Sequence, residues 1–249
     1  MTLVEEPTAN LYAHEIVPGD VPGGPSTSQT IMVASLQRLL SQVPPHGAPQ
    51  DYRSAVIDEN VLGKQTVAAR GWAFRQLRRF YGFDSGQLLF RALRDLWPDD
   101  GAGQPLLAML CALARDPVLR ASTAVIFGTD YGAEVAATDF APAIEEAFPG
   151  SYNDNTRRTA AQNMASSWQQ SGHLSAETVT KKTRCRAECT PADLSYALLL
   201  GHLQGARGQG LFKTLWSRVL DQPTSRLFDL AATASQRGML DLRHAGGVT

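Results

Sequence analysis

Between Asn153 and Ala187 the chain carries two local patterns that few folds accommodate side by side, a capped helix and a short β-prone segment. Asn153 or Asn155 can cap the helix, because a short polar side chain accepts hydrogen bonds from the unpaired N–H groups of the first turn. Gly172 can end it in the left-handed conformation that glycine adopts at helix C-termini. The spacing predicts a packed face and a separate polar face. The apolar residues are Ala160, Ala161, Met164 and Trp168, and the polar residues are Asn155, Arg158, Gln162 and Gln169.

A β-hairpin is predicted directly after this helix. His173–Leu174 is a candidate short strand, and residues 178–187 are rich in Thr and Val, which favour strands. Upstream, residues 139–148 predict a short acidic helix that ends at the Pro149–Gly150 turn. A helix, a turn, a second helix and a basic ribbon together predict a winged helix. The alternative is an ordinary surface helix and hairpin with scattered charge, because helix-turn-helix spacing has no fixed sequence signature.

The positive charge of this region predicts double-stranded DNA as the partner. Residues 151–190 hold six basic and three acidic residues, a net charge of +3, whereas the whole chain has a formal net charge of −1. Contact with nucleic acid must therefore come from a local patch. Arg158 and Gln162, between Asn155 and Gln169 on the polar face, are predicted to contact base edges, because an arginine fork bonds guanine and an amide bonds adenine. Phosphate contacts, which fix position without selecting sequence, are predicted for Arg157, Lys181, Lys182, Arg184 and Arg186.

The positions of apolar residues, Pro and Gly predict a mainly α chain whose helical body carries the winged-helix element. Residues 1–29 are rich in Gly and Pro and have few apolar side chains, so they are predicted to form a flexible N-terminal tail that is either mobile or laid over the surface. Residues 30–130 are predicted to form an N-terminal helical domain. Residues 131–249 are predicted to hold the winged-helix element and the C-terminal helices.

A second basic helix is predicted from Val67 to about Tyr81, after a cap at Thr66. Residues 64–95 contain seven basic and two acidic residues, a net charge of +5. Its exposed arginines are candidate phosphate contacts, although arginine stripes are also common on helix faces that contact only solvent. These candidates are Arg75, Arg78 and Arg79.

No residue pattern indicates an enzyme, a cofactor or a metal. Residues 63–66 (Gly-Lys-Gln-Thr) lack the first glycine and the preceding strand of a phosphate-binding loop. Cys185 and Cys189, with His173 and His202, match structural zinc sites poorly, because a second closely spaced pair is missing. An odd number of cysteines and an acidic N-terminus predict a reducing, cytoplasmic setting. No apolar run approaches the roughly 20 residues needed to cross a bilayer, so no membrane partner is expected.

Two segments carry a family resemblance. An Asn-x-Leu-x-Lys motif at residues 60–64 is followed by Thr66 and the arginine-rich helix, and residues 151–174 add the capped helix that ends in Ser-Ser-Trp-Gln-Gln-Ser-Gly-His-Leu. Together they resemble the BrxA family of bacterial BREX phage-defence systems over about residues 31–248. The Gly/Pro-rich N-terminus and Gly63 depart from the family pattern.

The resemblance implies a cytoplasmic, non-enzymatic protein that binds double-stranded DNA within a defence gene cluster, without a cofactor. It also implies a helical part similar to the antitermination factor NusB, and other BREX proteins as partners. Two alternatives stay open. The winged helix could pack against another subunit as a protein-interaction scaffold, or the basic helix at residues 67–81 could bind RNA.

Overall fold

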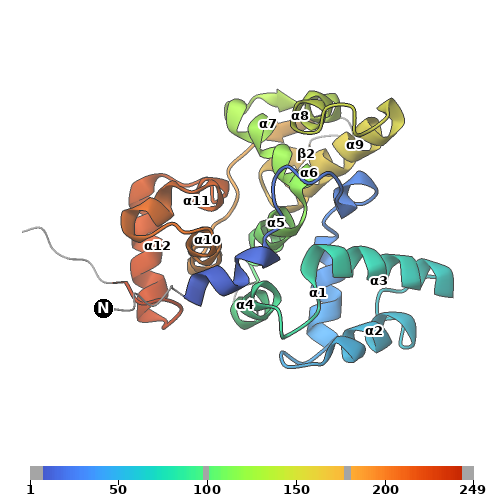
Figure 1. The fold of residues 1–249 in the computed structure, drawn as a ribbon, viewed down its shortest axis with the longest axis horizontal. Coiled ribbons are helices and arrows are strands. Elements are labelled where there is room, and N and C mark those ends of the chain that lie inside the picture. Colours follow the sequence, from blue (N-terminus) through green and yellow to red (C-terminus); the bar gives the residue numbers. More distant parts are fainter. Residues whose placement is uncertain (1–7, 98–100, 177–180, 243–249) are drawn as a thin grey trace, which may run out of the picture.

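The computed structural model describes residues 8–97, 101–176 and 181–242, and within these ranges the chain is mainly helical, as predicted (Figure 1). The α-helices are α1 (Val33–Gln42), α2 (Pro49–Ile57), α3 (Val67–Tyr81), α4 (Leu88–Leu96), α5 (Gln104–Arg115), α6 (Pro117–Ala121), α7 (Thr123–Gly128), α8 (Phe140–Ala147), α9 (Asp154–Gln170), α10 (Pro191–Leu203), α11 (Leu215–Val219) and α12 (Thr224–Gln236). The 3-10 helices are η1 (Thr8–Glu15), η2 (Pro25–Thr27), η3 (Ala137–Asp139) and η4 (Gly208–Lys213).

Helix α5 lies at the centre of the core, because it is apolar on every side. All of its residues from Leu106 to Ala114 are buried. Helices α1, α3, α4, α9 and α10 contact it, and Figure 1 shows it between the left and right halves of the molecule. One continuous cluster of buried residues extends from Ile16 to Ala231. The regions 30–130 and 131–249 therefore share a core.

The three short strands β1 (Glu134–Val135), β2 (Leu174–Ala176) and β3 (Lys182–Arg184) form an antiparallel sheet in the order β1-β3-β2. Along the chain the elements follow the order α7, β1, α8, α9, β2, β3. The predicted strands are confirmed at β2 and β3, although His173 precedes β2 and residues 177–180 lie outside the described ranges. The sequence does not predict β1, because two residues are too few to show an alternating pattern.

The segment from Glu15 to Val33 runs between helices and is not the flexible tail that the sequence predicts; residues 1–7 of that tail lie outside the described ranges. The Glu15 carboxylate accepts hydrogen bonds from the N–H groups of Leu88 and Leu89 at 2.8 and 2.9 Å, at the start of α4. Ile16 is buried in the core. Side chains from distant helices bond the backbone of this segment, and composition alone does not show such partners.

Asp116 fixes the middle of this segment. Its buried carboxylate caps α6 by accepting the Leu119 N–H at 2.9 Å, and it also accepts the Ser26 N–H at 2.7 Å. Gly24 packs directly on this carboxylate, since a Cβ atom at that position would lie 2.0 Å from Asp116 Oδ1. Burial raises the pKa of Asp116, because the ionised carboxylate loses its hydration. Glycine is thus required at position 24 by lack of space.

Replacing Gly24 with Ala should lower the free energy of unfolding by about 2 kcal/mol or more, because the new methyl group displaces the Asp116 carboxylate from its two N–H donors. Urea denaturation followed by circular dichroism measures this change. Gly210→Ala on η4 is the matched control, because no heavy atom lies within 4 Å of a Cβ there, and it should change stability by less than about 0.5 kcal/mol. Equal unfolding midpoints for the two variants would contradict the role of Gly24.

Candidate nucleic-acid interface

Helix α9 begins and ends where the sequence predicts. The Asn153 side chain caps it by accepting the Thr156 N–H at 2.8 Å, and Gly172 follows it with a φ of 86°. The apolar face is buried, and the indole N–H of Trp168 donates to Ser122 Oγ at 2.7 Å. The predicted cap, end and packed face of this helix are confirmed.

One flank of α9 holds the N-terminal segment. Asn163, Ser167 and Gln170 follow one another at spacings of four and three, so they lie along one line of the helix. Their side chains form hydrogen bonds with backbone groups of residues 26–33 at 3.0, 3.1 and 3.0 Å. This flank is therefore occupied and unavailable to a ligand.

The remaining face of α9 is exposed and polar. Asn155, Arg158, Gln162 and Gln169 are all exposed on it, and their spacings of three, four and seven keep them on one side of the helix. Arg158 Nη2 donates to Asn155 Oδ1 at 2.8 Å. A groove of about 320 Å³ borders Arg158 and Gln162, between α9 and the η3–α8 region. The four polar residues thus form the exposed row that their spacing predicts.

Arg157 is paired with two carboxylates. Its guanidinium group forms ion pairs with Glu145 of α8 and with Asp154, and it donates to the Tyr152 carbonyl at 2.8 Å. Only 24% of its side chain is exposed. A phosphate would have to displace both carboxylates, so this geometry weighs against the predicted phosphate contact.

Lys182 and Arg184 are buried, and the expectation that they face solvent is wrong. They are 8% and 3% exposed, and the Lys182 ammonium hydrogen-bonds Gln169 of α9. Burial lowers the pKa of Lys182, because the ammonium group loses its hydration. Residues two apart in a strand share a face, and β3 turns this face inward. The phosphate contacts predicted for both residues are therefore corrected.

Arg184 joins the centre of the sheet to two other parts of the molecule. It forms an ion pair with Asp221 Oδ2 at 2.8 Å and donates to the Ile126 and His173 carbonyls at 3.1 and 3.3 Å. The Tyr131 hydroxyl donates to Asp221 Oδ1 at 2.7 Å, and the Tyr131 ring centroid lies 4.9 Å from the Arg184 guanidinium carbon. Sequence reasoning missed Tyr131 and Asp221, because no local spacing links them to Arg184.

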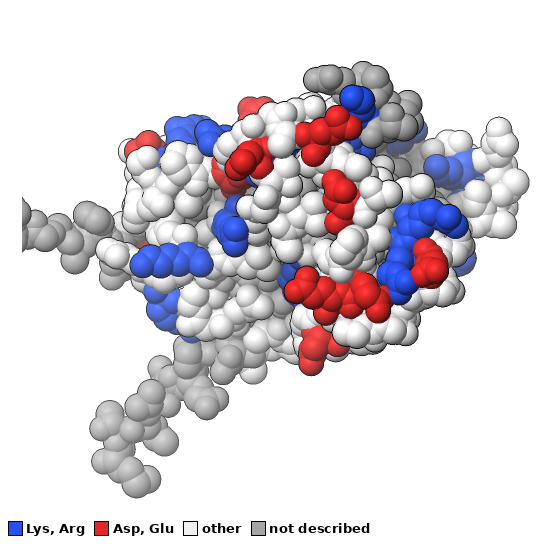
Figure 2. Space-filling model, turned by 90° about the horizontal axis from the view of Figure 1, so that it is seen from above, with Lys and Arg blue, Asp and Glu red and all other residues white. Residues whose placement is uncertain are grey.

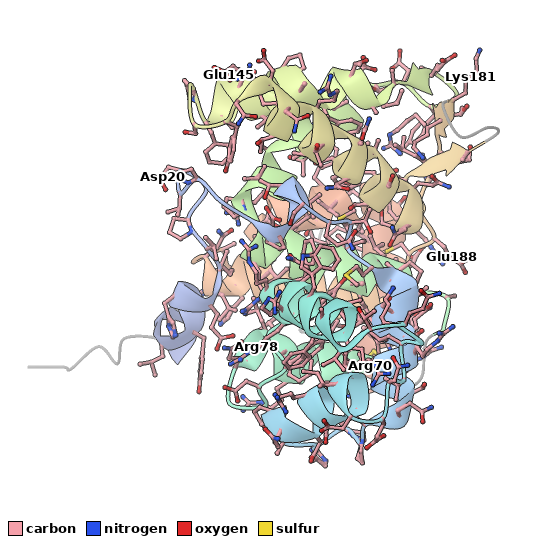
Figure 3. The ribbon with its side chains drawn as sticks, turned by 90° about the vertical axis from the view of Figure 1, so that its right-hand side faces the viewer. Asp20, Arg70, Arg78, Glu145, Lys181 and Glu188 are labelled. Carbon is pink, nitrogen blue, oxygen red and sulfur yellow. The ribbon has the colours of Figure 1, made fainter. Side chains whose placement is uncertain are left out.

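Arg186 and Lys181 are the exposed basic residues of the hairpin. The Arg186 guanidinium carbon lies 4.8 Å from the Tyr131 ring centroid, a cation–π contact that orients the side chain and leaves its charge in solvent. Lys181 is 62% exposed and pairs with Glu134 of β1 at 3.3 Å. Figure 3 shows Lys181 and Glu145 at opposite ends of the face that α9 crosses.

Folding brings carboxylates from other segments next to the basic residues of 151–190, so fewer positive charges there are unpaired than the local sequence predicts. Glu134 and Glu145 lie outside residues 151–190, yet they pair with Lys181 and Arg157. Figure 2 views the molecule from above Figure 1 and shows acidic and basic side chains interspersed on this face. Among the predicted DNA contacts of α9 and the hairpin, Arg158 and Arg186 are the exposed cations for which the described residues supply no ion-pair partner.

Arg75, Arg78 and Arg79 lie on a different element. All three are exposed on α3. Figure 3 shows α3 on the same side of the molecule as α9 but lower, and η2 of the N-terminal segment contacts both helices. The predicted site residues therefore form two groups, one on α9 and the hairpin and one on α3.

The described ranges contain no group of three or more His, Cys, Asp and Glu side chains that could hold a metal ion. Among the described residues, Cys111 and Cys185 are free thiols. Within the same ranges, every helix is too short or too polar to cross a membrane. Comparison of the chain with protein-family models and with curated protein sequences gives no match.

His173 docks the hairpin on the C-terminal helices. Its Nε2 lies 2.8 Å from the Val219 carbonyl and its Nδ1 lies 2.8 Å from Ser171 Oγ. Because a carbonyl only accepts, Nε2 carries the proton and Nδ1 accepts from Ser171. Burial lowers the pKa of His173 to about 4, since a charged imidazolium would lose its hydration there.

The free energy of unfolding should fall as the pH is lowered from neutral to about 4. In the unfolded state His173 binds a proton at its ordinary pKa, whereas in the folded state it binds one only near pH 4. This stabilisation is complete above the unfolded pKa and is lost as the pH falls through the folded pKa. The loss is at most about 3 kcal/mol. Urea denaturation across this range measures it. His173→Gln should remove most of the slope, and an unchanged slope in that variant would contradict the assignment.

Replacing Arg184 with Ala should lower the free energy of unfolding by about 3–5 kcal/mol, because Asp221 would be left buried without its cation. Arg186→Ala, two residues further along, removes the same charge from an exposed position and should leave the unfolding midpoint close to that of the wild type. Thermal or urea unfolding separates the two variants. The structural role of Arg184 would have to be abandoned if both unfolded at the same denaturant concentration.

Proposed function

We propose that the protein is a non-enzymatic double-stranded DNA-binding protein that uses α9 and the β2–β3 hairpin as a winged helix. The order α7, β1, α8, α9, β2, β3, with β3 between β1 and β2, supports this proposal. In helix-turn-helix proteins the second helix of the pair enters the major groove. Helix α9 holds that position here, and the hairpin directly after it holds the position of a wing.

The exposed row on α9 is the observation that carries the proposal. Asn155, Arg158, Gln162 and Gln169 share one side of the helix and are all exposed, whereas the other two sides are buried or bonded to the N-terminal segment. The major groove admits a helix and presents a distinct donor and acceptor pattern for each base pair. Arg158 suits guanine and Gln162 suits adenine. The row therefore supplies groups that discriminate between bases.

Phosphate contacts are assigned to the two exposed cations of the hairpin, Arg186 and Lys181. Arg186 is already oriented by Tyr131, so less side-chain entropy is lost when it binds. With about two phosphate contacts, the logarithm of the binding constant should fall with the logarithm of salt concentration with a slope of roughly −2. The proposed complex depends more on groove contacts than on bulk charge.

The cellular role follows from the family resemblance. Residues 60–64 and 151–174 resemble BrxA, which supports a place for this DNA-binding activity in a bacterial BREX-type phage-defence system, with other BREX proteins as partners. On this proposal the protein works in the cytoplasm. A bacterial strain carrying the defence genes and an Arg158→Ala allele would then restrict phage less well than wild type.

A protein-interaction role for the winged helix is the second candidate. Glu134, Glu145 and Asp154 lie among the basic residues of this face, and such mixed charge suits a protein surface better than a polyanion. On this reading, Arg158 pairs with a carboxylate of another subunit. RNA binding through α3 remains a third candidate.

Arg158→Ala should weaken binding to a preferred duplex by about fivefold to 150-fold, because one bidentate base contact is lost. Lys181→Ala should weaken binding to all sequences and make the salt slope shallower by about one unit. Fluorescence anisotropy with a labelled duplex over a salt series measures both effects. Arg226→Ala, at the exposed start of α12, makes the same charge change on an element outside the proposed interface and should leave affinity unchanged.

Gel shifts with duplex DNA, single strands and structured RNA separate the candidate functions. Preferential retention of duplex, with loss of affinity in Arg158→Ala but not in Arg226→Ala, supports DNA binding. Equal behaviour of Arg158→Ala and Arg226→Ala would contradict it and favour the protein-interaction role. Tighter binding of structured RNA would favour the RNA role of α3.

A further inference from the structure

Helix α3 presents an outward face that is distinct from the candidate DNA site. At about 3.6 residues per turn, its outward side chains fall within an arc of about 140°. Figure 1 shows the helix at the edge of the molecule. The exposed residues of this face are Val67, Ala68, Trp72, Arg75, Arg78 and Arg79.

This outward face, which we call the α3 face, is apolar in its first half and basic in its second. Val67 is 66% exposed and Trp72 is 37% exposed, although both are large hydrophobic residues. Gly71 lies between them, and the Arg75 guanidinium reaches to 3.7 Å from the position of a Cβ on Gly71. Trp72 and Arg75, three residues apart, are neighbours on the helix surface. An aromatic ring and three positive charges are thus placed side by side.

The arginines of the α3 face differ from the basic residues around the hairpin. Each ion pair found among the described residues involves Arg157, Lys181 or Arg184, and none involves Arg75, Arg78 or Arg79. The negative end of the helix dipole favours basic residues in the last turn. This effect explains why arginines occupy positions 78 and 79 at the end of α3. It does not account for the exposed tryptophan and valine beside them.

We infer that the α3 face docks an acidic, amphipathic segment of a partner protein, with an apolar side chain on Trp72 and carboxylates on the three arginines. Trp and Arg are among the residues most enriched in the hot spots of protein interfaces. Charge complementarity at such a face selects the partner and fixes its orientation. The inference does not rest on the proposed DNA binding, because none of its residues lies on α9 or the hairpin.

The apolar half of the face favours a protein over a nucleic acid. Phosphates would pair with Arg75, Arg78 and Arg79, and Trp72 could stack on a base. The side chains of Val67 and Ala68, however, offer neither a hydrogen-bond donor to phosphate nor a ring for base stacking. An acidic segment with an apolar end matches both halves. The distance along the helix axis from Val67 to Arg79 is about 18 Å, which matches roughly three turns of a docked helix.

A labelled synthetic peptide with leucines at one end and glutamates at the other tests the inference with the full-length protein. Fluorescence anisotropy should show binding of this peptide and much weaker binding of a counterpart in which glutamine replaces glutamate. The double variant Arg75→Glu/Arg79→Glu should bind the acidic peptide about tenfold more weakly or worse. Trp72→Ala should weaken it by a similar factor.

Arg91→Glu/Arg226→Glu is the charge-matched control, because both arginines are exposed on other helices, α4 and α12. This control should bind the peptide as wild type does, and unchanged urea midpoints would confirm that all variants fold. Failure of the wild-type protein to prefer the glutamate peptide over the glutamine peptide would overturn the inference. So would a loss of duplex affinity in Arg75→Glu/Arg79→Glu with peptide binding unchanged, since the α3 face would then contact DNA.

Discussion

The buried Asp116 carboxylate connects the parts of the molecule that set the position of α9. It caps α6 through the Leu119 N–H and holds the N-terminal segment through the Ser26 N–H. Burial raises its pKa because hydration is lost, and two backbone donors replace part of that hydration. Once residues 24–26 are fixed in this way, the backbone up to Val33 lies within reach of the side chains on the flank of α9. A segment rich in glycine and proline thereby becomes part of the framework.

The three sides of α9 have three different roles, and its exposed row results from the other two. The apolar side packs in the core, where Trp168 also donates to Ser122. The flank with Asn163, Ser167 and Gln170 bonds the N-terminal segment. Both sides are held by groups far away in the sequence, so the helix has little freedom to roll about its axis. Arg158 and Gln162 therefore lie on the one side of α9 that stays exposed.

Charge is distributed by pairing and does not form one broad patch. Around α9 and the hairpin, Glu134, Glu145 and Asp221 pair with Lys181, Arg157 and Arg184. Ion pairs of this kind lower the local potential, so a polyanion meets only the few cations left over. On α3 the arginines stand without such partners among the described residues, beside exposed Trp72. The two outward helices thus offer different chemistry, hydrogen-bonding groups on α9 and an amphipathic basic surface on α3.

Local sequence patterns predict the helices, the cap at Asn153, the stop at Gly172, the exposed row on α9 and two of the three strands, because each depends on residues within a few positions of one another. Tertiary structure decided which charges remain available. Lys182 and Arg184 are buried because β3 turns their side chains inward. Asp221 and Tyr131 contact Arg184, and Glu145 pairs with Arg157. No local sequence pattern links these residues to the arginines that they contact. It also decided that residues 15–33 are ordered, since their hydrogen-bond partners lie on α4, α6 and α9. Periodicity shows which side of an element is apolar, but an ion pair depends on two positions in space, and only the folded chain brings these together.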